Sequence, residues 1–129
     1  MTPELIALAL VALEHVILVG WSQMLLTRDV GPEGNAGPRD NLPEFSRDTG
    51  RLRRALANHT ENFPFFIGAV AVVLLSDSAS GVTATCALIY AAARALYIPA
   101  YAFGWTPWRS VFYMTGFLAT AVMYIAAVF

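Results

Sequence analysis

Four long runs of mostly apolar residues, separated by shorter polar segments, dominate the chain. The runs cover residues 3–26, 52–75, 82–101 and 108–129. Each is close in length to the ~20 residues that an α-helix needs to cross the hydrocarbon core of a bilayer. The pattern therefore predicts an all-α fold, a single domain (1–129) built as an integral membrane bundle of four transmembrane helices.

The connections between the runs differ in length and composition. The first covers about residues 27–51 and is polar, with several glycines and prolines, whereas residues 76–81 and 102–108 form two short segments. Clusters of glycine, proline, serine and asparagine are typical of turns and irregular loops. We therefore expect one long loop and two tight turns.

The composition indicates lipid as the solvent around these helices. The chain is 57% hydrophobic and 13% charged, with a net charge of −1 and a mean hydropathy of +0.57. A soluble domain carries about a quarter charged residues, so membrane lipid is the expected surrounding. The weak net charge gives no sign of a nucleic-acid partner. With one cysteine and two histidines, none at ligand spacing, neither a disulfide within the chain nor a metal site is expected.

The placement of arginine predicts how the chain is oriented. All eight basic residues are arginine, and the second connection contains none of them. Basic residues are retained in cytoplasmic loops. We therefore expect the first and third connections in the cytoplasm and both termini on the other side, in the inner membrane if the protein is bacterial. The arginines that carry this prediction are Arg28, Arg39, Arg47, Arg51, Arg53, Arg54 and Arg109.

Three polar residues share one face at the cytoplasmic start of the second run. Arg54, Asn58 and Glu61 are spaced i, i+4 and i+7, and a helix turns by about 100° per residue, so their side chains project on the same side. Charged side chains inside a span are costly and rare without partners. This face is therefore a candidate binding surface.

The third and fourth runs bring further polar residues to the same depth. Arg94, Tyr97 and Tyr101 share a face near the cytoplasmic end of the third run, and Arg109 and Ser110 begin the fourth. The arginines outnumber the single carboxylate there, which favours an anionic ligand that enters from the cytoplasm. The planar guanidinium suits such a ligand because it can donate two parallel hydrogen bonds to a carboxylate.

Three structural alternatives stay open. Glu61 could form an ion pair with Arg54 or Arg94 that only joins helices. Glu14 and His15, near the middle of the first run, are either structural contacts in the bundle or a proton-handling pair, although adjacent positions point about 100° apart. Tyr113 and Tyr124 are open to interpretation as interfacial belt residues.

The polar motifs resemble those of one membrane-protein family. The similarity covers the whole chain in length and number of spans. The matching motifs are Arg54-Ala55-x-x-Asn58-x-x-Glu61-Asn62-x-Pro64, Arg94-x-x-Tyr97-x-x-x-Tyr101, Arg109-Ser110 and, more weakly, Pro38-x-Asp40. They resemble the MAPEG family, the membrane-associated proteins in eicosanoid and glutathione metabolism. Within it the chain is most similar to short bacterial members and to the microsomal glutathione transferases.

This resemblance implies a homotrimer of four-helix subunits that uses glutathione as co-substrate, in sites between subunits near the cytoplasmic face. It implies that Arg109 stabilises the thiolate and that Ser110 assists the chemistry. The glutathione-binding residues that it implies are Arg28, Arg54, Asn58, Glu61, Arg94, Tyr97 and Tyr101.

The resemblance further implies a glutathione-dependent transferase or peroxidase that acts on lipophilic small-molecule electrophiles, a detoxification activity. Tyr97 stands where the prostaglandin synthase branch has histidine, which favours the glutathione-conjugating branch. One alternative is a non-catalytic MAPEG-like protein that binds lipid or a partner protein. A small transporter or scaffold is a further alternative, disfavoured because no pair of broken helices is evident.

Overall fold

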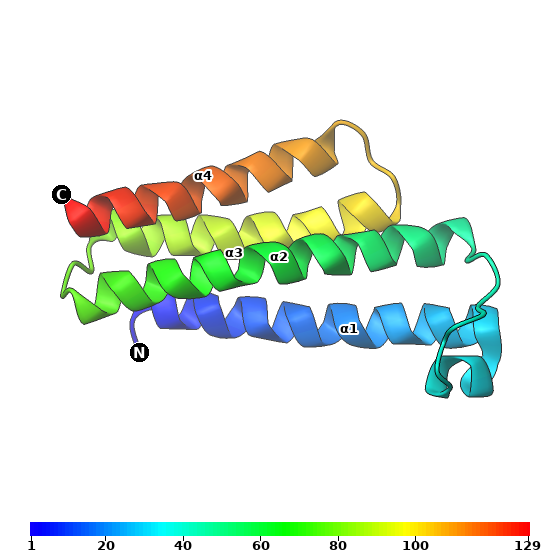
Figure 1. Ribbon diagram of the computed structural model, residues 1–129. Coiled ribbons are helices and arrows are strands. Elements are labelled where there is room, and N and C mark those ends of the chain that lie inside the picture. Colours follow the sequence, from blue (N-terminus) through cyan, green and yellow to red (C-terminus); the bar gives the residue numbers. More distant parts are fainter.

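Four helices lie side by side in the computed structural model, which describes all 129 residues (Figure 1). Their bounds are α1 Pro3–Ala36, α2 Arg47–Leu75, α3 Gly81–Ala102 and α4 Trp108–Val128. Successive helices run in opposite directions, so both termini lie at one end of the bundle (Figure 1). The predicted all-α bundle of four helices is confirmed.

Three of the helices are long and apolar enough to cross a membrane, namely α1, α3 and α4. The remaining helix, α2, combines a charged first half with an apolar second half and lies along the other three for most of its length (Figure 1). The charged half of α2 places polar residues beside these apolar helices. The chain is therefore an integral membrane protein.

The interior is built from small apolar side chains at the end that carries the termini. Eleven buried residues from all four helices form one cluster there, and five of them are alanine. Lipid tails are as apolar as leucine, so helices in a membrane associate through close packing, which small side chains permit. At the centre of this cluster Phe66 stacks on Tyr90, with ring centroids 3.9 Å apart.

The packing order places α2 and α3 in the middle of the fold. The first helix packs on α2 and α3 and makes no contact with α4, whereas α4 also packs on α2 and α3. Near the termini the buried carboxylate of Glu4 accepts a hydrogen bond of 2.7 Å from the Thr83 hydroxyl, which ties α1 to α3. Polar residues of α2 and α3 can therefore face either α1 or α4.

The first connection is shorter than the sequence predicts, because helix continues into it from both sides. Helix α1 runs beyond residue 26, turns at Gly31 (φ 75°) and ends with a short helical piece that begins at Pro32. Glycine readily adopts this positive φ, and proline is favoured at the first position of a helix. Helix α2 already begins at Arg47, so only residues 37–46 lack helical structure.

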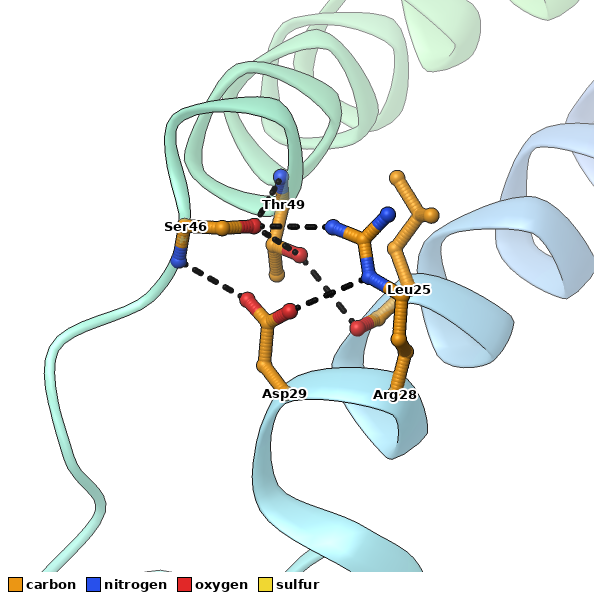
Figure 2. A network of polar contacts seen from close by, with 5 residues as sticks. All are labelled: Leu25, Arg28, Asp29, Ser46 and Thr49. Carbon is orange, nitrogen blue, oxygen red and sulfur yellow. Dashed lines mark hydrogen bonds and ion pairs between the residues drawn. The ribbon is translucent and has the colours of Figure 1, made fainter.

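A polar clasp joins the end of α1 to the start of α2 (Figure 2). Ser46 caps α2, and its backbone N–H donates to the Asp29 carboxylate over 2.8 Å. The Arg28 guanidinium donates to the Ser46 hydroxyl over 2.9 Å and to Asp29 over 3.3 Å. The Thr49 hydroxyl donates to the Leu25 carbonyl over 3.3 Å. The clasp thus fixes both ends of the first connection.

Candidate functional site

A cavity of about 390 Å³ lies between α2, α3 and the start of α4, and we call it the polar pocket. Its position follows from the chain order, since the last turns of α3 and the first turns of α4 meet beside the first half of α2. The pocket is lined by Asn58, Tyr97, Tyr101, Arg109, Ser110, Tyr113 and Met114.

Arg109 is the charged group of the polar pocket. The first turn of α4 leaves it exposed, and its guanidinium lies over the ring of Tyr101, 4.8 Å from the ring centroid. Tyr101 in turn meets Tyr97 edge to face, with centroids 5.6 Å apart. Attraction between the cation and the ring face orients the guanidinium and leaves its N–H groups available to a ligand. Arg109 forms no ion pair.

An apolar groove of about 430 Å³ lies on the same side of the bundle, along α2 and α4. Tyr113 lines both the groove and the polar pocket, so the two cavities adjoin. The Tyr124 hydroxyl donates to the Phe65 carbonyl over 2.9 Å and holds α4 against α2 beside the groove. The groove is lined by Glu61, Asn62, Phe65, Tyr90, Tyr113, Phe117, Thr120, Ala121 and Tyr124.

Arg94 occupies a different environment from Arg109. It is 1% exposed and lines neither cavity. Its guanidinium lies 5.1 to 5.7 Å from the ring centroids of three tyrosines that surround it, Tyr90, Tyr97 and Tyr113. One of its nitrogens donates to the Asn58 side-chain oxygen over 3.0 Å. Arg94 therefore orients a residue of the polar pocket from behind.

The face predicted on α2 divides among three surroundings. Asn58 lines the polar pocket and Glu61 the apolar groove, because three residues along a helix leave side chains about 60° apart. Arg54 is exposed and lines neither cavity. The ion-pair interpretation of Glu61 is wrong, since the ion pairs of the chain are Arg28–Asp29 and Arg47–Asp48.

Arg28 belongs to the clasp in Figure 2 and does not reach the polar pocket of its own chain. Among the residues predicted for the site, the structure brings together Asn58, Tyr97, Tyr101, Arg109 and Ser110.

Two residues of the polar pocket, Tyr113 and Met114, are absent from the site predicted by sequence. Tyr113, which the sequence left open to interpretation as an interfacial belt residue, lines both cavities. A signal for Tyr113 existed in its spacing: it follows Arg109 by four residues and so shares its helix face. No group of three or more His, Cys, Asp or Glu side chains lies together in a metal-binding arrangement.

The fold and the adjoining cavities define the class of this protein, a four-helix integral membrane protein with a polar pocket at one end of the bundle. A family model described as the MAPEG family matches residues 4–129. The chain therefore belongs to the MAPEG family. A search of curated proteins found no match to the chain.

Proposed function

We propose that this protein is a glutathione-dependent transferase or peroxidase that attacks lipophilic electrophiles. The observation that carries the proposal is the set of side chains around Arg109: an accessible guanidinium shares one pocket with Asn58, Ser110 and three tyrosines. Such a set can hold a charged peptide and leave one cation for the sulfur. Membership of the MAPEG family supports the same substrate, because the family includes glutathione transferases.

Arg109 is the proposed activator of the thiol. A free thiol has a pKa of about 8.5, and the thiolate is the nucleophile. Lowering that pKa by about two units requires roughly 2.7 kcal/mol of preferential stabilisation of the anion, which a guanidinium in a partly dry site can supply. The thiol proton leaves to solvent, and the sulfur forms a bond to the electrophilic carbon while the leaving group departs with its electron pair. Ser110, the next residue, is placed to donate a hydrogen bond to the sulfur or the leaving group.

The apolar groove is the proposed site for the electrophile. It adjoins the polar pocket at Tyr113, so a molecule in the groove lies next to a sulfur held by Arg109. The groove lies along the outside of the bundle between α2 and α4, where a lipophilic compound reaches it from the membrane. This arrangement gives a physical reason for a glutathione enzyme to be embedded in lipid.

A homotrimer is the proposed assembly, with both termini outside the cytoplasm and the polar pocket near the cytoplasmic face. Arg28, Arg54 and Glu61 lie outside the polar pocket of a single chain, which is consistent with a site completed between subunits. Helix α1 also leaves a broad apolar surface for lipid or a neighbouring subunit. Its exposed residues include Leu13, Val16, Ile17 and Met24.

The test is a thermal-shift titration of the purified protein in detergent with glutathione, followed by a chromogenic conjugation assay. A ligand at one hundred times its Kd stabilises the folded state by about 2.7 kcal/mol, so a rise in the midpoint is expected. The matched control is the tripeptide in which alanine replaces cysteine, which should bind without reacting. Binding without conjugation would favour a non-catalytic family member. No binding of either tripeptide would overturn the proposal.

A further inference from the structure

A layer of polar residues interrupts the apolar interior between α1, α2 and α3. On α1, Glu14 and His15 lie between the core residues Val11 and Leu18. His59 has the corresponding place on α2, and Arg94 on α3. Six buried side-chain atoms of these residues have no hydrogen-bond partner in the protein. They are Glu14 Oε2, His15 Nδ1, His59 Nδ1 and Nε2, and Arg94 Nε and Nη2.

The position of α1 explains how two adjacent residues both enter this layer. Neighbouring side chains on a helix point about 100° apart, and α1 packs on α2 and α3 at once. His15 faces α2, where its ring stacks on that of His59 with centroids 5.3 Å apart. Glu14 projects about 100° away around α1, and its buried Oε2 atom has no hydrogen-bond partner in the protein. The layer therefore joins three helices.

The two imidazoles cannot satisfy one another. Their planes are inclined by only 28°, and imidazole donates and accepts hydrogen bonds in the plane of its ring. Stacked rings therefore direct their nitrogens past each other and toward a third partner. His59 is fully buried, so bulk solvent cannot be that partner.

Water inside the layer can supply the missing partners. Nearly all buried polar groups in proteins are hydrogen-bonded, to protein or to ordered water. A buried water typically makes about three hydrogen bonds to groups that lack other partners. Carboxylate, imidazole and guanidinium groups on three facing helices provide donors and acceptors for such waters.

Arg94 connects this layer to the polar pocket. One of its terminal nitrogens donates to Asn58, which lines the pocket, while its Nε and its other terminal nitrogen remain without partners. The rings of Tyr90, Tyr97 and Tyr113 surround the guanidinium, and none of them carries a charge to offset it. A partner that holds Nε and Nη2 of Arg94 in place therefore also holds Asn58, through the hydrogen bond between the two residues.

We propose that Glu14, His15 and His59 are positioning residues: they form one water-bridged hydrogen-bond network with Arg94, and this network holds Asn58 in the polar pocket. The network itself stands apart from the proposed function, and only its effect on glutathione affinity rests on it. The ligand of the new site is water, held by one carboxylate, two imidazoles and one guanidinium.

The chain offers a clean spectroscopic test because His15 and His59 are its only histidines. We expect Glu14→Gln to move the ¹⁵N resonances of both imidazoles in protein labelled at histidine. The His59 signal decides, since His59 lies on another helix and makes no direct hydrogen bond to Glu14. The matched control is Glu4→Gln, a buried carboxylate on the same helix that is bonded to Thr83 outside the layer. That variant should leave the His59 signal in place.

Unchanged His59 resonances in a folded Glu14→Gln protein would overturn the network. If that variant fails to fold, Glu14→Asp keeps the carboxyl group but withdraws it by one methylene, and it should still move the His59 signal. A His59 signal that is indifferent to Glu14→Asp would overturn the proposal in the same way.

A second measurement tests the consequence for the pocket. Glu14→Gln weakens the support of Arg94, which orients Asn58. We therefore expect this variant to bind glutathione roughly tenfold more weakly, with kcat nearly unchanged. Glu14→Asp should restore part of the affinity. Unchanged affinity beside moved resonances would overturn the positioning role alone. If the unsubstituted protein binds no glutathione, the proposed function fails, and the resonances still decide whether the network exists.

Discussion

Arg94 and Arg109 both lie over tyrosine rings, in opposite surroundings. Arg94 is buried in the bundle behind Asn58, with two nitrogens unpartnered inside the protein. Arg109 is exposed at the start of α4 and faces a cavity. A buried guanidinium is held by its neighbours and cannot meet a ligand, whereas an exposed one keeps its donors free. The same residue type therefore positions a pocket in one place and is available for chemistry in the other.

The largest effect that this comparison predicts is on folding. Arg94→Gln removes a buried guanidinium that donates to Asn58 and lies over three tyrosine rings, and losing a hydrogen bond to a charged group costs about 1.5–3 kcal/mol. We expect a correspondingly lower free energy of unfolding in detergent. The double variant Arg94→Gln/Glu14→Gln should recover part of the loss, because both residues belong to the proposed network and the second change removes a group that has already lost its partner. Full additivity of the two single losses would contradict the coupling.

The next effect is on activity without loss of stability. Arg109→Ala should lower the conjugation rate by about 10²- to 10³-fold, the usual cost of removing one group that stabilises a developing anion. Its melting midpoint should stay near that of the unsubstituted protein because the side chain is exposed. Arg47→Ala is the control, since Arg47 is exposed and lies outside both cavities. A fully active Arg109→Ala protein would remove Arg109 from the mechanism.

A third prediction concerns the contact between α2 and α4 beside the apolar groove. A Cβ at Gly68 would overlap the Tyr124 hydroxyl, the group that donates to the Phe65 carbonyl. We expect Gly68→Ala to cost about 1–3 kcal/mol of unfolding free energy, as overpacking usually does. The same change in a Tyr124→Phe background should cost less, because the overlapping oxygen is gone. Equal costs in both backgrounds would contradict this packing.

The smallest effect lies in the clasp, outside the predicted membrane spans. Hydrogen bonding lowers the pKa of the Asp29 carboxyl from about 3.8 to about 2. The Thr49 side chain is the largest cause, and the Ser46 backbone N–H is the second. A carboxyl with a lowered pKa in the folded state stabilises the protein above its ordinary pKa. This contribution should be lost as pH falls from about 4 to about 2. Asp29→Asn should abolish that pH dependence of the melting midpoint, and a variant with an unchanged pH profile would contradict the assignment.

The fold could be predicted from the sequence because four apolar runs of bilayer length allow few arrangements of the helices. The extension of α1 beyond residue 26 could not be predicted, since a glycine followed by a proline, here Gly31 and Pro32, usually marks a loop. Here the glycine turns the backbone and the proline begins a second helical piece. The clasp partners Asp29 and Ser46 lie 17 positions apart, and periodicity carries no information about such a pairing.

The sequence could predict which residues of the candidate site share a helix face, but not how deeply each residue is buried. Spacing correctly grouped Arg94 with Tyr97, whose ring it contacts, but gave no sign that Arg94 is buried. Burial depends on which helices pack against α3, and this is decided by contacts distant in sequence. For the same reason Glu61 was grouped with Asn58, although the structure assigns the two residues to adjoining cavities.

The most direct test of the central role given to Arg109 is the ultraviolet difference spectrum of bound glutathione, which reports thiolate formation. At neutral pH the unsubstituted protein should show the thiolate band when glutathione is added. The Arg109→Ala variant, saturated with glutathione as judged by its thermal shift, should show little or none. An undiminished thiolate band in that variant would contradict the account of Arg109 as the activating cation.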